Sequence, residues 1–323
     1  MITMAKALNQ ALRESLDEDP KVLVMGEDVG RLGGVFRVTD GLQTQFGAER
    51  VFDTPLAEGG IIGTAVGLCM RGYRPVCEIQ FDGFVYPGFD QIVSQVAKLR
   101  FRSDGLISVP LTIRIPFGGG IGAIEHHSES PEAYFAHTAG LKVVCCADPS
   151  DAYWMLRQAI ASDDPVVFFE PKRRYWGKGE IAADERQVPD LHQARVVRAG
   201  RDVSVVAYGP MVATALASAE VAARDGQELE VIDLRSISPL DTATLVESVR
   251  RTGRAVVLHE AAGSFGVGAE VAARIQEHAF YSLAAPVLRV TGLDTPYPPS
   301  RLEEEWLPNV DRILDAVDRV LEY

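Results

Sequence analysis

Short apolar runs alternate with segments of helical periodicity along almost the whole chain. In the first half, residues 59–70 and 89–99 carry apolar side chains at the three- and four-residue spacing of a helix face. Runs rich in Val, Ile, Leu and Phe predict strands at residues 21–26, 74–81, 109–115 and 165–170. Strands that alternate with helices in this way predict a parallel sheet with right-handed crossovers.

A polar, irregular stretch then interrupts the pattern, which restarts near residue 200. Four further strands are expected at residues 203–209, 229–234, 255–259 and 287–291. A chain of 323 residues suits two domains. We therefore expect an α/β protein with a first domain at residues 1–175, a linker at 176–199 and a second domain at 200–323.

Local signals mark several helix starts. Residues 1–19 have an amphipathic helical pattern rather than that of a signal peptide. Ser130-Pro131 and Asp148-Pro149 each combine a capping side chain with a proline suited to the first turn.

Composition narrows the function classes. The net charge of −13 argues against nucleic acid or an anionic membrane as a partner, since phosphate binding needs basic clusters. The one dense basic run, Lys172-Arg173-Arg174, is interpreted as solvated surface. No apolar run approaches the roughly 20 residues of a membrane span. Four cysteines without metal or redox spacing, two of them adjacent at Cys145 and Cys146, indicate core residues in a reducing cytosol.

Three glycine clusters are candidates for a nucleotide-binding loop: GRLGG, GGGIG and GSFGVG. None matches the dinucleotide fingerprint in its strand-to-helix context, and GxxxxGK[ST] is absent. Tight turns are the preferred explanation.

Three features are ambiguous on spacing alone. His126-His127 lies between a glycine-rich loop and a helix start, a place where α/β folds bind ligands, but it has no metal-ligand partners nearby. Glu58, in DTPLAEGG, opens a strongly apolar helix and could be no more than a partner of the helix dipole. Glu27, directly after a strand, has the same ambiguity.

Taken together, these segments resemble the beta subunit of the thiamine-diphosphate-dependent 2-oxo acid dehydrogenases. The resemblance covers the whole chain and is carried by VLVMGEDVG, RVFDTPLAEGGIIGTAVGLCMRGYRPVCEIQFDGF, HHSESPEAYFAHTAGLKVV, DPVVFFEPK, VIDLRSISPLD and HEAAGSFGVGAEV. It implies a pyrimidine-binding α/β domain followed by a transketolase C-terminal domain, in a cytoplasmic bacterial protein.

The resemblance also implies roles for individual residues. Glu58 would hydrogen-bond the aminopyrimidine of thiamine diphosphate, so that the cofactor removes its own thiazolium proton. Phe84 would pack on the pyrimidine, and Leu56 and Gln80 would line the same pocket. His127 would donate a proton as the acyl group passes to lipoamide, a task that suits histidine because it titrates near neutral pH. His126 would be only its neighbour.

Two further assignments follow from the same resemblance. Glu27 would belong to an acidic relay behind the pocket, near a subunit interface. Backbone groups near Ile160 and Asp163 would bind a potassium ion.

The metal motif of thiamine-diphosphate enzymes, GDG followed about 30 residues later by asparagine, does not occur. The resemblance then implies that an alpha subunit holds magnesium and the diphosphate, and that this chain alone is inactive. An α2β2 heterotetramer that docks on a dihydrolipoyl acyltransferase core is expected.

The substrate is less constrained. HSESPEAYFAH and EPKRRY are closer to the branched-chain type than to the pyruvate type. Pyruvate-specific or acetoin-cleaving relatives remain alternatives, as do a non-catalytic scaffold subunit and a single-chain transketolase-like enzyme.

Overall fold

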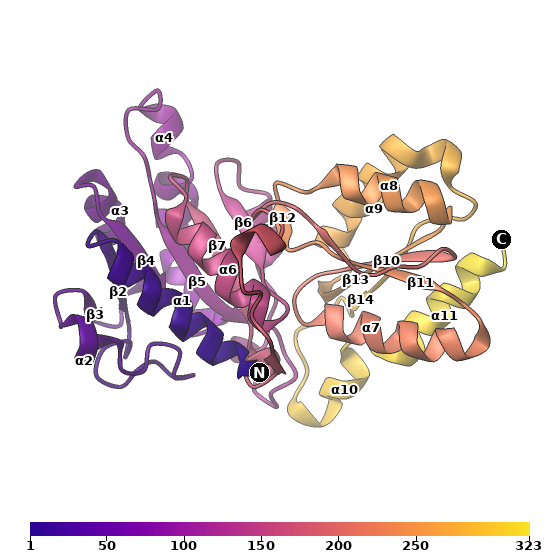
Figure 1. Ribbon diagram of the computed structural model, residues 1–323, viewed down its shortest axis with the longest axis horizontal. Coiled ribbons are helices and arrows are strands. Elements are labelled where there is room, and N and C mark those ends of the chain that lie inside the picture. The colour runs from indigo at the N-terminus through magenta and orange to yellow at the C-terminus, as the bar shows by residue number, and fades with distance from the viewer.

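A computed structural model describes all 323 residues as two α/β halves side by side (Figure 1). The larger sheet has seven strands, in the order β12 (Ser236–Ser238), β6 (Lys142–Cys145), β7 (Val166–Pro171), β5 (Thr112–Phe117), β4 (Arg74–Glu78), β2 (Val22–Gly26) and β3 (Val51–Asp53). The smaller sheet has five, in the order β14 (Leu288–Gly292), β13 (Ala255–Ala262), β10 (Val203–Ala207), β11 (Leu229–Asp233) and β9 (Arg195–Arg198). Two short strands, β1 (Ile2–Thr3) and β8 (Lys178–Gly179), form an antiparallel pair of their own.

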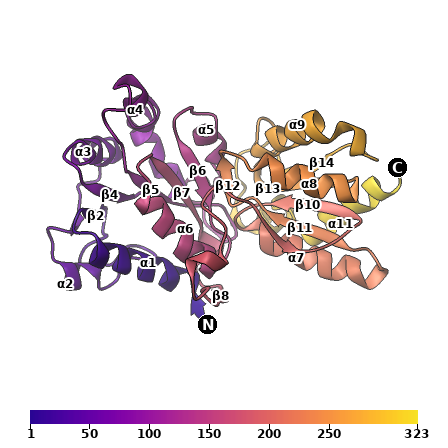
Figure 2. The same cartoon turned by 45° about the horizontal axis from the view of Figure 1, so that its top comes forward.

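Helices cover both faces of each sheet (Figure 2). The first half contains α1 (Met4–Glu18), α2 (Leu42–Phe46), α3 (Glu58–Met70), α4 (Leu99–Arg102), α5 (Glu132–Ala136) and α6 (Pro149–Ala161). The second half contains α7 (Met211–Ala222), α8 (Thr242–Thr252), α9 (Val267–Ala279), α10 (Glu303–Trp306) and α11 (Val310–Leu321). The alternation of apolar runs along the chain thus predicted the α/β class and the order of the main elements correctly.

One hydrophobic core joins the two halves. A cluster of 37 buried residues includes side chains of β5 and α3 from the first half and of β13 and α9 from the second. Separate clusters lie on the outer faces, under α1 and α6 in the first half and under α7 and α11 in the second. The two halves therefore pack directly against each other through a shared core.

Helix-start signals acted as expected at α6. The Asp148 side chain accepts a hydrogen bond of 2.9 Å from the backbone N–H of Asp151, and Pro149 occupies the first turn.

The expected α-helix at residues 89–99 is wrong in type. The chain forms a 3-10 segment at Asp82–Gly88, a π-helical segment at Gln91–Val96 and only then the short α4. Pro87 lacks a backbone N–H, which disfavours a continuous α-helix across this stretch. The apolar stripe still buries Ile92 and Val96, so the pattern identified the face but not the helix type.

Two other expectations need correction. Edge strands β9 and β12 are antiparallel to their neighbours, so neither sheet is wholly parallel. The stretch interpreted as an irregular linker contains the strands β8 and β9. Strand β12, which lies in the second half of the sequence, extends the seven-stranded sheet of the first half.

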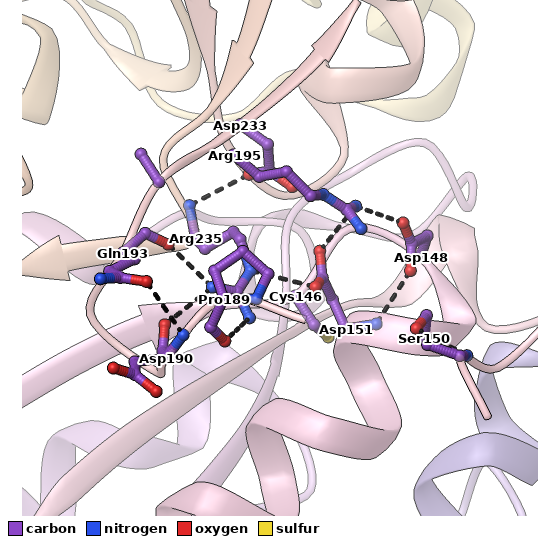
Figure 3. Close-up of polar contacts among 12 residues, drawn as sticks. Cys146, Asp148, Ser150, Asp151, Pro189, Asp190, Gln193, Arg195, Asp233 and Arg235 are labelled. Atoms are coloured by element: carbon purple, nitrogen blue, oxygen red, sulfur yellow. Dashed lines mark hydrogen bonds and ion pairs between the residues drawn. The ribbon is translucent and has the colours of Figure 1, made fainter. Parts of the chain in front are cut away.

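A buried polar network fastens the halves together around Arg235 (Figure 3). Its Nε donates to Asp151 at 3.0 Å, and Nη1 donates to the carbonyls of Asp190 and Gln193 at 2.9 and 2.8 Å. Arg195 donates to Asp148 and Asp151 at 2.6 and 3.0 Å. A fully buried guanidinium needs such a set of partners, and Arg235 of the second half finds them in the first half and in the segment between the halves.

All four cysteines are buried and outside disulfides, as expected for core residues. None of the helices combines the length and the apolar character that crossing a bilayer would require.

Candidate active site

The predicted site residues gather where four adjacent strands end. Strands β5, β4, β2 and β3 are parallel neighbours, so their carboxyl ends lie along one edge of the sheet. Glu27 follows β2, Glu58 follows β3, Gln80 and Phe84 follow β4, and His127 lies in the loop after β5. This edge is where open α/β sheets bind ligands.

Glu58 is the first residue of α3 and is only 8% exposed. Its carboxylate makes no hydrogen bond or ion pair within the chain, and its oxygens are not among the fully buried polar atoms, so they keep some contact with solvent. The segment Asp82–Gly88 packs directly over this helix start, where a Cβ on Gly88 would lie 3.2 Å from the Glu58 carbonyl oxygen. A glycine there lets the two backbones approach closely.

Glu27 lies behind Glu58 as a second buried acid. Both of its carboxyl oxygens are buried without a hydrogen-bond partner. Burial raises the pKa of the Glu27 carboxyl, and the charges of Glu58 and Asp28 raise it further. Gln80 binds the same segment: its Nε2 donates to the Glu27 backbone carbonyl at 3.4 Å and to the Asp28 side chain at 3.0 Å.

An aromatic cluster holds the His127 imidazole. The ring stacks on Phe81, with centroids 4.1 Å apart and planes inclined by 13°, and meets Phe84 edge-on at 5.2 Å. Its Nδ1 is buried without a partner, while His126 is exposed beside Glu125. The two histidines thus differ in environment: the His127 ring packs against Phe81 and Phe84, and the His126 side chain is exposed. Phe81 was missed because nothing in its spacing distinguished it from the strand before it.

A buried ion pair lies beneath these rings. Lys172 Nζ contacts the Asp82 carboxylate, and both side chains have no exposed surface. Burial lowers the pKa of Lys172 and raises that of Asp82 to about 6, although Lys172 opposes the second shift. The interpretation of the Lys172-Arg173-Arg174 run as solvated surface was therefore wrong for Lys172, because the sequence did not reveal its carboxylate partner 90 residues away.

Leu56 lies at the same edge, in the turn between β3 and Glu58, but its side chain is 80% exposed. The positions predicted to bind potassium lie elsewhere. Ile160 lies in the last turn of α6 and Asp163 lies between α6 and β7, at the opposite edge of the sheet.

Those backbone carbonyls do not fit a potassium ion. Arg74 Nη1 donates to the carbonyl oxygens of Ile160, Ala161 and Ser162 at 3.3, 3.2 and 3.0 Å. Its Nη2 donates to the Asp163 carboxylate at 2.6 Å. A guanidinium thus already supplies the positive charge that the end of helix α6 favours.

The residues present do fit one half of a thiamine diphosphate site. An unpartnered carboxylate on the largely buried Glu58, with the aromatic ring of Phe84 on the segment that packs over the same helix start, suits the edge and face of an aminopyrimidine. They do not fit magnesium, since no three His, Cys, Asp or Glu side chains are grouped to hold a metal ion.

This fold and site define a class: chains with a transketolase-type pyrimidine-binding domain followed by a transketolase C-terminal domain. Residues 1–177 match the family described as "Transketolase, pyrimidine binding domain", and residues 192–313 match "Transketolase, C-terminal domain". A solved structure titled "Split gene transketolase, inactive beta4 tetramer" superposes with a TM-score of 0.83 at 25% identity, over 99% of this chain and 98% of that one.

Closer relatives narrow the class. The "Pyruvate dehydrogenase E1 component subunit beta" of Leifsonia xyli is 62% identical over 322 residues, which span 100% of this chain and 95% of the relative. The "3-methyl-2-oxobutanoate dehydrogenase subunit beta" of Mycobacterium tuberculosis is 59% identical over 321 residues, 99% of this chain and 92% of the relative. The chain belongs to the family of beta subunits of 2-oxo acid dehydrogenase E1 components, and this membership implies thiamine diphosphate as the cofactor.

Proposed function

We propose that this chain supplies the activating half of a thiamine diphosphate site in an enzyme that oxidatively decarboxylates branched-chain 2-oxo acids. The observation that carries the proposal is Glu58 at the first turn of α3: the residue is only 8% exposed, and its carboxylate, which keeps some solvent access, has no partner in the chain. When bound, the cofactor supplies the electron sink for decarboxylation. Glu58 holds the proton at the pyrimidine ring nitrogen, Phe84 orients the ring, and Gln80 and Leu56 line the pocket.

In this proposal Glu27 is the acid behind Glu58. Its carboxyl has a raised pKa and lies close enough for the two charges to interact. That arrangement suits a group which exchanges protons rather than one which remains a fixed anion. His127, stacked on Phe81, donates a proton as the acyl group passes to the lipoyl group of an acyltransferase.

An alpha subunit completes the site and holds magnesium and the diphosphate. Support comes from the surface beside Glu58, where Leu56 is exposed and α3 presents an uncovered face of Gly60, Thr64, Gly67 and Met70. Small residues let another backbone approach closely, and an apolar exposed face is typical of an interaction surface. We expect an α2β2 heterotetramer that docks on a dihydrolipoyl acyltransferase core.

The test of the catalytic role is Glu58→Gln in the complex assembled with its alpha subunit. We expect decarboxylation to fall by at least about 100-fold, because a glutamine cannot exchange the proton. Glu49→Gln, an exposed residue away from the site, is the matched control and should keep wild-type activity. Near-intact decarboxylation in Glu58→Gln would favour a non-catalytic scaffold subunit.

Substrate preference needs its own measurement. The segments HSESPEAYFAH and EPKRRY favour the branched-chain type, whereas the 62% identity to the Leifsonia relative favours pyruvate. We expect kcat/KM for 3-methyl-2-oxobutanoate to exceed that for pyruvate in the assembled complex. A preference for pyruvate would overturn the branched-chain assignment and leave the role of Glu58 untouched.

A further inference from the structure

The glycine-rich loop that leads to His127 is held by carboxylates of the second half of the chain. The Gly120 N–H donates to Glu303 Oε1 at 2.9 Å, and the Gly122 N–H donates to Glu303 Oε2 at 3.1 Å. The Gly119 N–H donates to Glu260 Oε1. Glu303 opens α10 and Glu260 lies in β13, so both acceptors come from elements far from the loop in sequence.

Tyr297 completes this contact. Its hydroxyl donates to Glu303 Oε1 at 2.6 Å and accepts from the Gly120 N–H at 3.3 Å. A Cβ on Gly119 would lie 1.8 Å from that hydroxyl, so only glycine permits this approach. Glu260, Glu303 and Tyr297, called the clamp below, are all largely buried.

The arrangement explains the GGGIG cluster without a nucleotide. Gly118, Gly120 and Gly122 have φ values of +80°, +82° and +72°, and backbone N–H groups in such turns converge into a concavity that favours an anion. In this chain the anions are the carboxylates of its own second half. In turn, Glu303 receives hydrogen bonds from Gly120, Gly122 and Tyr297. Glu260 receives one from Gly119 and pairs with Arg173 at 3.1 Å, and such partners make the burial of both carboxylates tolerable.

The loop is fixed at its other end by the first half. The Gly118 N–H donates to the Glu129 carbonyl at 2.8 Å, and the Glu129 N–H donates to Asp82 at 2.8 Å. His127 lies between these two anchors, with its ring against Phe81. Its position at the site therefore depends on both halves of the chain.

We propose that Glu303 and Glu260, with Tyr297, are positioning residues that hold the His127 loop in its reactive place. The proposal rests on the function above, in which His127 acts on the reacting groups. It predicts that loosening the clamp lowers the rate of the step that His127 serves, while binding of the 2-oxo acid is left intact.

Amide hydrogen exchange on the full-length chain tests the clamp without any reference to activity. In Glu303→Gln, one acceptor oxygen is replaced by an NH₂ group that cannot accept from a glycine N–H. We expect the peptide covering residues 118–127 to exchange at least about tenfold faster than in the wild type, because exchange follows local opening. Glu304→Gln, the exposed neighbour on the same helix, should exchange like the wild type. Unchanged exchange in Glu303→Gln would overturn the proposal.

Two partial reactions in the assembled complex test the positioning role: decarboxylation with an artificial oxidant, and acyl transfer to a lipoyl domain. We expect Glu303→Gln to change the ratio of these two rates in the same direction as His127→Ala, by about tenfold or more, with KM for the 2-oxo acid unchanged. An unaltered ratio would overturn the proposal. Tyr297→Phe, which removes one hydroxyl, should give a smaller change of the same kind and serves if Glu303→Gln does not fold.

The Glu58→Gln result separates the two proposals. If Glu58→Gln stays active, the proposed function fails, while the exchange measurement still reports on the clamp. If Glu58→Gln is inactive but Glu303→Gln matches the wild type in both assays, the function stands and the clamp proposal fails.

Discussion

Tyr208 donates a hydrogen bond of 2.5 Å from its phenol to the Glu132 carboxyl group, and both side chains are almost fully buried. Glu132 opens α5 in the first half, and Tyr208 directly follows β10 in the second. This contact joins the halves beside the shared core, and the second Glu132 oxygen has no partner. A carboxyl group in such a place is better accommodated when it is protonated.

Stability should therefore depend on pH through Glu132. Burial raises its pKa from an ordinary value of 4.5 to about 7, against an opposing effect of the Tyr208 hydrogen bond. The folded state then binds the proton more tightly than the unfolded chain, so this group's contribution falls as pH rises from 4.5 to about 7. We expect Glu132→Gln to be more stable than the wild type by about 1–3 kcal/mol at pH 8, and the difference to vanish near pH 4.5.

Chemical unfolding at several pH values measures this difference. Glu304→Gln, which removes a charge from an exposed position, is the control and should track the wild type throughout. A Glu132→Gln variant that is equally destabilised at every pH would contradict the assignment of a buried, protonated carboxyl.

Arg74 should make the fold independent of potassium. Its guanidinium donates to three carbonyl oxygens after α6 and to Asp163, where the family resemblance implied a potassium site. We expect the same thermal midpoint in potassium and sodium chloride at equal ionic strength. Arg74→Met should lower the free energy of unfolding by about 1–3 kcal/mol, since it removes the donors to these acceptors. A midpoint that rises with potassium but not with sodium in the wild-type chain would argue for a resident ion instead.

The buried pair of Asp82 and Lys172 gives a third prediction. Lys172→Met leaves the Asp82 carboxylate buried with only the Glu129 N–H as a close partner, and should cost about 3–5 kcal/mol at pH 8. Lower pH should reduce this loss, because protonated Asp82 no longer needs a cation and its pKa already lies at about 6 with Lys172 present. Asp82→Asn combined with Lys172→Met should recover more than half of the loss, since asparagine can still accept from the Glu129 N–H.

Urea unfolding of the two single variants and the double variant completes this cycle. If the double variant is as unstable as the sum of the singles, the two residues do not interact and the pair carries no coupling energy.

The sequence predicted those parts of the fold that depend on local pattern. Apolar spacing located β2, β4, β7 and α3, and the cap at Asp148 located α6. Patterns failed where a distant group decides the outcome. No neighbour of Lys172 in the sequence indicates its pairing with Asp82. The antiparallel direction of the edge strands β9 and β12 depends on the strands with which they pair, β11 and β6.

The candidate site likewise contains residues that local pattern identifies and residues that only a distant contact identifies. Glu27, Gln80, Phe84 and His127 each stand shortly after a strand, so their convergence follows from the parallel topology. Glu303 could not be found this way, because 181 residues separate it from Gly122 and no local spacing records the contact.

Gly83 provides the last prediction, since its backbone lies in close contact with the backbone of the histidine loop. A Cβ on Gly83 would lie 2.4 Å from the backbone carbonyl oxygen of His126, and a backbone atom cannot rotate away as a side chain can. Gly83→Ala should therefore displace His126 and His127 together and weaken the stacking of His127 on Phe81. We expect a loss of about 10- to 100-fold in the step that His127 serves, of the size that a displacement near 1 Å produces.

Partial-reaction assays on the assembled complex measure that loss. Gly67→Ala is the matched control for Gly83→Ala in stability measurements on the isolated chain, since a Cβ there meets no atom within 4 Å. Gly67→Ala should therefore not lower the unfolding midpoint and should raise it slightly, because alanine is favoured over glycine in a helix interior by roughly 0.5–1 kcal/mol. A Gly83→Ala enzyme that retains wild-type rates in both partial reactions would mean that the loop adapts freely, and that the place of His127 is not set by its two anchors.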